Sequence, residues 1–280
     1  MIVINKREEQ PGELEAWLQE NEVEVQQKLA SANTTGTKMW NEFTEKEDFP
    51  KDELRQALLE DQGYICCYCG FPVNNNGQEC VIEHFKPKSK SEFKNLTFDY
   101  TNLFASCKGG SKNIVHIKQQ DDTIDSIAAF YDIPQNYLFD RVGDFDSIPV
   151  NKPVIIKKVV GNEEQHCDCL KGSKELNIDL INPDNFPVFH FSHDGEVNCN
   201  EDDEGSKEDL RKLGLNSNFE LSYLRHLHYE HSLDLFRTLR KNDPESFSHK
   251  FRLLKQKYYQ KDQMLRHKAF FFIYKSIWGN

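Results

Sequence analysis

Two cysteines in the segment YICCYCG have the spacing that zinc sites use. Cys66 and Cys69 are separated by two residues, which allows both thiolates to turn toward one metal ion. A redox-active pair is the rival interpretation, but that motif needs a strand before it and a helix after it, whereas FPVNNNG follows here. We therefore interpret the pair as half of a structural zinc site.

A closed structural zinc site needs two further ligands. Cys107 in NLFASCKGG and Cys167 in QHCDCLKG are the best candidates, and Cys169 or His166 could take the fourth place instead. The chain has eight cysteines, and in a cytosolic protein their spacing favours metal binding over disulfides. The predicted structural zinc ligands are four thiolates: Cys66, Cys69, Cys107 and Cys167.

A carboxylate and an imidazole are adjacent in VIEHFKPKS, where an apolar run ends. Glu83 could bind a hard divalent ion, and a neutral His84 ring could take a proton from an attacking water. This pairing suits metal-assisted hydrolysis. A Glu-His pair is by itself only a surface dipeptide in most proteins, so the interpretation depends on the order of the motifs around it.

The motifs follow one another in a specific order. The C-x2-C pair comes first, then Glu-His with a proline three residues after the histidine, then Tyr-x-Asn-Leu at 100–103, then Cys107, and then Cys-Asp-x-x-Lys at 167–171. This order resembles that of the HNH, or ββα-metal, nucleases. The resemblance implies a general base, an amide that braces the loop, two ligands of a catalytic Mg²⁺ or Mn²⁺ ion, and a lysine beside them. These roles fall in that order on His84, Asn102, Glu83, Asp168 and Lys171.

Two features depart from the family pattern. Asp168 stands where the family more often has histidine or asparagine, although a carboxylate is a competent ligand for Mg²⁺ or Mn²⁺. The last two cysteines usually form a second C-x2-C pair, whereas Cys107 and Cys167 lie 60 positions apart. Because the cost of closing a loop grows only logarithmically with its length, we interpret residues 108–165 as an insertion that leaves the zinc knuckle intact.

The resemblance covers residues 57–198, in segments such as IEHFKPKSK, LTFDYTNLFASCKGG and INPDNFPVFHFSHDGEV. These segments are similar to the HNH nuclease subunit of Septu-type and retron-associated anti-phage systems. The similarity implies an endonuclease that hydrolyses phosphodiester bonds, with DNA favoured, beside an SMC-like ABC ATPase partner. The alternatives are a ribonuclease that acts on tRNA with the same site, and a zinc-ribbon binding module without catalysis.

Lysines close to the candidate catalytic residues could contact the phosphates of a nucleic acid. A solvated lysine loop is the competing interpretation. His226, His228 and His231 fit no single helical face, so we do not expect a metal site there. The candidate phosphate-binding side chains are all cations: Lys86, Lys88, Lys90, Lys94 and Lys171.

Helices and short strands must position these groups. Pro50 and Gly63 bracket a predicted helix that leads into the C-x2-C pair. Two short strands are expected from Glu79 to Phe85 and from Leu96 to Phe104. A further strand is expected in VNKPVIIKKVV, at 150–160.

The outer parts of the chain have clearer patterns. A weak amphipathic helix is expected from Gly12 to Leu29, and Asp194-Gly195 predicts a hairpin turn. Beyond Ser206 the pattern is helical, with a break at Asp243-Pro244. The expected fold is α+β, with a zinc-stabilised ββα-metal core. Its predicted parts are a helical N-terminal arm, the nuclease core with its insertion, and a helical C-terminal region: residues 1–62, 63–200 and 201–280.

The composition is typical of a globular protein. No stretch of 18 apolar residues and no secretory segment occurs in the sequence, so we expect a cytoplasmic protein that does not cross a membrane. The formal net charge of −11 is unusual for a protein that binds nucleic acid. Acidic residues concentrate in residues 1–60 and basic residues in 236–268, so the C-terminal face could hold nucleic acid and the N-terminal region could face a partner protein.

Overall fold

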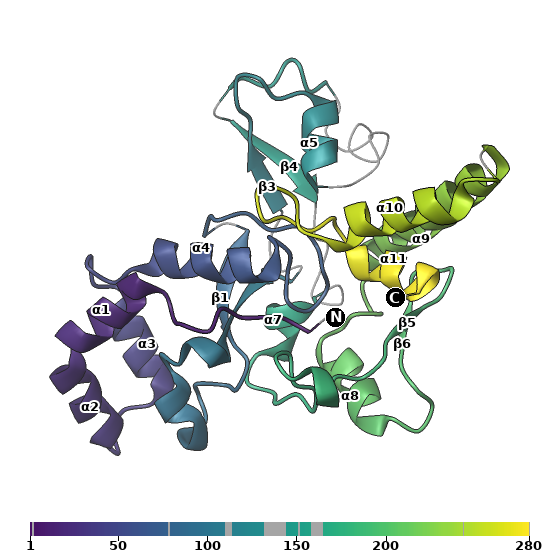
Figure 1. The fold of residues 1–280 in the computed structure, drawn as a ribbon. Helices are drawn as coiled ribbons and strands as arrows, with labels where there is room; N and C mark the ends of the chain where they lie inside the picture. Colours follow the sequence, from purple (N-terminus) through teal and green to yellow (C-terminus); the bar gives the residue numbers. More distant parts are fainter. Residues whose placement is uncertain are drawn as a thin grey trace.

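The computed structural model describes residues 1, 3–77, 79–109, 114–131, 144–150, 152–157, 165–242 and 244–279. Helices and three short two-stranded sheets alternate in this part of the chain, which confirms the expected α+β class (Figure 1). Within the described residues, no helix has the length and apolar character needed to span a membrane.

Four helices precede the C-x2-C pair: α1 (Gly12–Glu20), α2 (Glu22–Ala30), α3 (Gly36–Thr44) and α4 (Lys51–Gln62). The prediction for α4 is confirmed, since Pro50 precedes it and Gly63 ends it with a left-handed φ of +75°. The single helix expected between residues 12 and 29 is instead two helices that meet at Asn21.

The N-terminal helices enclose an aromatic cluster. The Trp17 ring packs edge-on against Phe43 and Phe49, with ring centroids 5.3 Å and 4.9 Å apart. Trp40 stacks on Phe98, which follows the 3-10 helix η1 (Ser91–Leu96), at a centroid distance of 5.9 Å. Large buried aromatic side chains contribute strongly to a core, so this cluster attaches the N-terminal helices to the segment that follows the Glu-His pair.

A two-stranded antiparallel sheet carries the central motifs. Strand β1 (Cys80–His84) pairs with β2 (Leu103–Cys107), in a register that places Cys80 opposite Cys107 and His84 opposite Leu103. The prediction for β1 is confirmed, but the second strand begins later than expected. Asp99 accepts a hydrogen bond from the Thr101 amide and caps the 3-10 helix η2 (Tyr100–Asn102), which uses residues expected to be extended.

Among the described residues between Cys107 and Cys167, two strands and one helix are present. Strand β3 (Ile114–Ile117) pairs with β4 (Pro153–Lys157), and helix α5 (Ile124–Tyr131) lies between them in sequence. Strand β4 confirms the expected strand in VNKPVIIKKVV for residues 153–157, and part of that prediction lies outside the described residues. The unit projects from the rest of the molecule (Figure 1). The chain then enters the short helix α7 (Cys167–Lys171), which packs against β2.

The C-terminal part begins with the 3-10 helix η4 (Pro183–Asn185) and the strands β5 (His190–Phe191) and β6 (Val197–Asn198), which pair as predicted around a turn at Gly195. Helix α8 (Glu204–Lys212) follows. The chain then forms α9 (Phe219–Asn242), α10 (Phe247–Tyr259) and α11 (Phe271–Trp278), so the predicted helical region and its break after Asn242 are confirmed, while Asp243 itself lies outside the described residues.

Candidate metal centre and adjoining polar site

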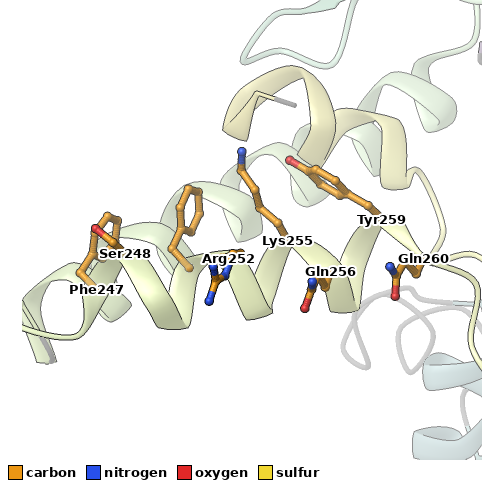
Figure 2. Close-up of a pocket in the computed structure, with 8 residues that line it drawn as sticks. Phe247, Ser248, Arg252, Lys255, Gln256, Tyr259 and Gln260 are labelled. Carbon is orange, nitrogen blue, oxygen red and sulfur yellow. The ribbon is translucent and has the colours of Figure 1, made fainter.

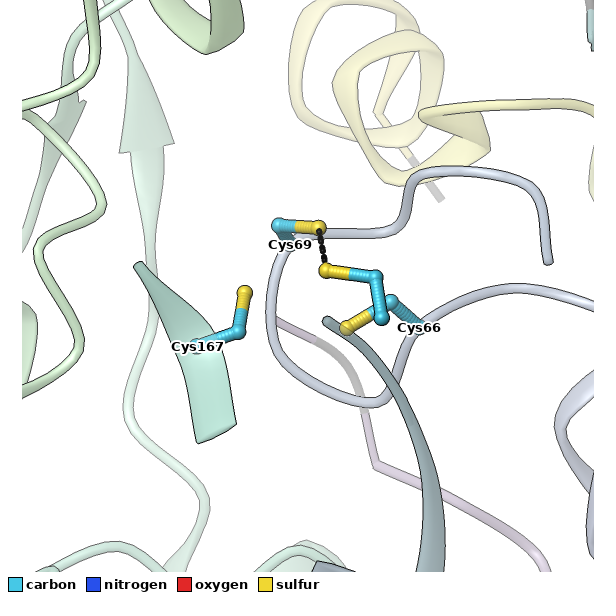
Figure 3. A group of neighbouring side chains, drawn as sticks. Cys66, Cys69 and Cys167 are labelled. Carbon is cyan, nitrogen blue, oxygen red and sulfur yellow. Dashed lines mark hydrogen bonds between the residues drawn. The ribbon is translucent and has the colours of Figure 1, made fainter. Parts of the chain in front are cut away.

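Four buried cysteines form a cluster that can hold a metal ion such as zinc. Their sulfur atoms all lie within 4.8 Å of one another, and each side chain is at most 4% exposed. Figure 3 shows Cys66, Cys69 and Cys167 with their sulfurs turned toward a common centre. The Sγ atoms of Cys69 and Cys107 are 3.8 Å apart. A tetrahedral zinc site with Zn–S bonds of about 2.3 Å requires sulfur separations of about 3.8 Å, so the residues fit this metal.

The local backbone turns the first two thiolates toward one point. The Gly70 amide donates to the Cys66 carbonyl at 3.0 Å, and Gly70 has a φ of +74°. A Cβ atom at Gly70 would lie 2.0 Å from the Phe272 ring of α11. Glycine is therefore required here for both its backbone conformation and its lack of a side chain.

The segment that follows Cys107 forms a backbone hydrogen bond with the segment that precedes Cys167. The His166 amide donates to the Gly109 carbonyl at 2.7 Å, and a Cβ at Gly109 would lie 1.7 Å from the His166 carbonyl oxygen. Because Cys107 and Cys167 flank this contact, residues 60 positions apart occupy neighbouring corners of the cluster. That residues 108–165 are an insertion stays a prediction, and part of this range lies outside the described residues.

The alternative fourth ligands lie outside the group of four sulfurs. Cys169 is only partly buried and is not a member of the cluster. The Nδ1 atom of His166 lies 3.0 Å from the Cys167 sulfur and 4.0 Å from the Cys107 sulfur, so the ring contacts the cluster from its edge. Burial raises the pKa of the Cys167 thiol, because its thiolate has no access to water. A divalent cation would compensate such buried thiolates.

Glu83 lies at the end of β1 in a buried polar network. Its Oε1 atom accepts a hydrogen bond from the Tyr68 hydroxyl at 2.9 Å and forms an ion pair with the Lys171 ammonium at 2.6 Å. Lys171 is 1% exposed and also donates to the His84 carbonyl at 3.0 Å. The predicted residues Glu83 and Lys171 are thus in direct contact, and the network joins β1, α7 and the cysteine knuckle.

Asp168 belongs to α7, lies beside Glu83 of β1 and is partly buried. Burial, a hydrogen bond to Glu83 and repulsion from its charge raise the pKa of Asp168 to about 8. The ammonium groups of Lys171 and Lys88 oppose this shift. The two adjacent carboxyl groups resist being charged at the same time. Their oxygen atoms form a donor pair that fits a hard divalent cation, and the cation would favour the charged form of both groups.

The surroundings of His84 determine which ring nitrogen is available as a base. Nε2 lies 3.0 Å from the Thr97 carbonyl oxygen, which can only accept a hydrogen bond. Nε2 therefore carries the ring proton, and Nδ1 is left as an acceptor, 3.2 Å from the Lys88 ammonium. Burial and the nearby Lys88 charge lower the pKa of His84 well below its ordinary value, which keeps the ring neutral. The edge contact with Trp40, at a centroid distance of 4.5 Å, fixes the ring plane.

Asn102 hydrogen-bonds the turn after His84, at the position where the resemblance implies a bracing amide. Its side-chain oxygen accepts from the Lys86 amide at 2.7 Å, and its amide group donates to the carbonyls of Lys86 and Leu96 at 3.1 Å and 3.2 Å. The side chain is 5% exposed and makes three hydrogen bonds to backbone. This residue can therefore hold the turn without contacting a substrate itself.

The lysines predicted to contact phosphates have different surroundings. Lys88 is half-buried and faces His84, whereas Lys90 forms an ion pair with Glu175 and Lys86 lies 4.0 Å from the same carboxylate. Lys94 donates to backbone carbonyls at the end of α2. Lys88 is thus the lysine of this loop that the fold directs at the Glu-His pair.

Some contributors to the site could not be identified from the sequence motifs. Tyr68 lies between Cys66 and Cys69 in the sequence, and this position was the one feature that could have indicated its contact with the site. Thr97 acts through a backbone carbonyl, which any residue could provide, and Trp40 comes from a helix more than 40 positions before His84. Among the described residues, the histidines of α9 belong to no group that could hold a metal ion.

No protein-family model matches the chain, and no curated protein is significantly similar to it in sequence.

Proposed function

We propose that the protein is a metal-dependent endonuclease of the HNH type that hydrolyses phosphodiester bonds in nucleic acid, with DNA the favoured substrate. One observation carries the proposal: a neutral His84, held by Thr97 so that Nδ1 is its acceptor, faces Lys88, and the Lys88 ammonium interacts electrostatically with both Glu83 and Asp168. A base beside a cation-binding pair is the arrangement that phosphodiester hydrolysis requires.

The protein's own residues would divide the work as follows. Nδ1 of His84 takes the proton of the attacking water, and Asn102 holds the turn that carries this ring. Glu83 and Asp168 would hold Mg²⁺ or Mn²⁺, and the bound ion would stabilise the charge that develops on the phosphate. Lys88, which donates to Nδ1 at 3.2 Å, would exchange this bond for a non-bridging phosphate oxygen when substrate enters.

The cysteine cluster would have a structural role. Strands β1 and β2 have five residues each and α7 has five, so this unit can bury little apolar area of its own. A zinc ion held by four thiolates would fix the start of α7, and hence Asp168 and Lys171, relative to β1. A cytoplasmic location, an SMC-like ATPase partner and a role in anti-phage defence complete the proposal, and the partner and the defence role rest on the sequence resemblance.

The test compares wild type with His84→Ala and His228→Ala, each assayed for bound zinc. His228 is the matched control, because it is also buried, at 5% exposure, and its ring packs against Phe270 and Tyr274 in the C-terminal helices. Plasmid DNA, single-stranded DNA and tRNA are incubated with each protein in Mg²⁺ or Mn²⁺, with and without the ATPase partner.

We expect DNA cleavage by wild type and His228→Ala and none by zinc-loaded His84→Ala. Cleavage of tRNA alone would change the substrate class to RNA and retain the mechanism. Equal cleavage by wild type and His84→Ala, or none by any protein under all conditions, would refute the catalytic proposal and favour a zinc-ribbon binding module.

A further inference from the structure

Helix α10 and the last two turns of α9 form a basic helical pair at the C-terminal side of the molecule. We call residues 235–242 and 247–259 the basic arm. It contains no acidic residue and seven cations: Arg237, Arg240, Lys241, Lys250, Arg252, Lys255 and Lys257. In a chain of net charge −11, this is a strong local excess of positive charge. The arm extends away from the sheet that carries the candidate site (Figure 1).

The arm is poorly covered by the rest of the protein. Helix α10 has 13 residues, and none of them is buried. Leu253, on the side facing α9, is 49% exposed. A helix in a globular protein normally buries an apolar stripe, whereas the aromatic residues of α10 that pack against α9 and α11 are only half-buried. A ligand is the simplest reason for a fold to keep such a surface.

Both long sides of α10 are grooved, and both contain cations. One groove, of about 510 Å³, lies between α9 and α10 and is lined by leucines together with Lys250 and Lys257. The other groove, of about 520 Å³, is lined by side chains that recur about once per turn along α10, among them Arg252 and Lys255 (Figure 2). Charge on two sides of one helix favours an extended polyanion over a single acidic helix, which would fill one groove.

The second groove also contains groups that suit nucleotides. Phe251 and Tyr259 supply aromatic surface, and Gln256 and Gln260 supply amides that can both donate and accept hydrogen bonds. Aromatic rings beside arginine and lysine are the combination by which proteins hold nucleic acid strands with little sequence preference. The chemistry of the surface therefore matches a sugar-phosphate chain.

We propose that the basic arm binds the phosphate backbone of the nucleic acid substrate at a distance from the cleavage site. The inference rests on the proposed function for the identity of the bound strand as substrate. Binding at the arm would offset the acidity of the remaining surface, which by itself would repel a polyanion. It would add affinity without sequence specificity, since phosphate contacts carry no sequence information.

The experiment measures binding of a fluorescent DNA duplex and of tRNA by anisotropy over a range of salt concentrations. All proteins carry His84→Ala, so that no strand is cut. The arm variant is Arg252→Gln/Lys257→Gln, which removes one exposed cation from each groove. The control variant is Lys38→Gln/Lys51→Gln, which removes two exposed cations from the N-terminal helices. Thermal unfolding shows whether both variants are folded.

We expect the arm variant to bind about 10-fold more weakly and the slope of log K against log salt to fall by about 2, because each phosphate contact contributes about 0.9 to that slope for duplex DNA. The control variant should match the parent protein. Equal binding by the arm variant and the parent, or no binding by the parent, would overturn the inference. Displacement of DNA by polyglutamate at equal charge concentration would also overturn it, in favour of an acidic protein partner.

A small substrate separates this inference from the proposed function. Hydrolysis of bis(p-nitrophenyl) phosphate needs only the catalytic residues, and we expect the arm double substitution in the otherwise wild-type protein to leave its rate unchanged. If wild type hydrolyses this ester no faster than His84→Ala, the proposed function fails, while the anisotropy data still decide whether the arm binds nucleic acid.

Discussion

The ion pair between Lys171 and Glu83 should be the most sensitive polar contact of the core. Their side chains are 0% and 6% exposed, and the ammonium and carboxylate are 2.6 Å apart. Substituting Lys171→Met leaves a buried carboxylate whose hydrogen bonds to Tyr68 and Asp168 remain but whose charge has lost its cation. Removal of one partner of a buried ion pair costs about 3–5 kcal/mol, so we expect the free energy of unfolding to fall by about that amount.

The second substitution shows whether the cost comes from the unpaired charge. In Glu83→Gln/Lys171→Met both charges are absent, and glutamine can still accept the Tyr68 hydrogen bond. We expect the double variant to be less destabilised than the sum of the single variants by at least about 1.5 kcal/mol, the coupling expected for groups in contact. The free energies are measured by urea denaturation with zinc held in excess.

A surface ion pair provides the control. Lys28 forms an ion pair with Glu42, and the two side chains are 29% and 44% exposed, so Lys28→Met should cost less than about 1 kcal/mol of ion-pair energy because water screens the pair. Additive effects of Glu83→Gln and Lys171→Met, or a cost for Lys171→Met no larger than for Lys28→Met, would show that the 2.6 Å contact does not stabilise the core.

Three further substitutions test the zinc knuckle and the brace. Gly109→Ala should lower zinc affinity strongly, because its Cβ would lie 1.7 Å from the His166 carbonyl oxygen. The affinity is measured by competition with a chelator. Gly172→Ala is the control, because Gly172 has a similar φ of +53° but an added Cβ there would have no atom within 4 Å. Cys167→Ser should lose zinc in the same assay while Cys169→Ser retains it, and the reverse result would reassign the fourth ligand. Asn102→Ala removes three buried hydrogen bonds, so we expect about 2 kcal/mol of destabilisation in urea and at least about 10-fold slower cleavage, and an unchanged rate would refute its role in holding the His84 turn.

The sequence could predict those features that depend on neighbouring residues. Pro50 precedes α4 and Gly63 ends it, and the turn at Asp194-Gly195 joins the two strands of the expected hairpin. Both features could be predicted because the backbone conformation near proline and glycine is set locally. The second strand of the central sheet was misplaced for a reason that is also local. The side chain of Asp99 competes for the backbone amides that a strand would have used, and hydrophobic alternation does not reveal that competition.

Residue types and spacing also indicated which groups could do chemistry. They selected the cysteines, Glu83 and His84, because metal and proton chemistry require particular donor atoms whatever the fold, whereas Asn102 and Asp168 were indicated by the resemblance to the HNH nucleases. They left open which of Cys167, Cys169 and His166 completes the cluster. That choice depends on the contact between Gly109 and His166, which joins segments nearly 60 positions apart.

The tertiary structure alone decided how each of these groups is tuned. The ring nitrogen of His84 that remains an acceptor is set by a carbonyl at Thr97, the raised pKa of Asp168 by burial and by the proximity of Glu83, and the direction of Lys88 by the turn that Asn102 holds. Burial, pKa and hydrogen-bond direction are properties of an environment assembled from distant segments. A sequence specifies which donor atoms are present, and packing specifies what each of them can bind or release.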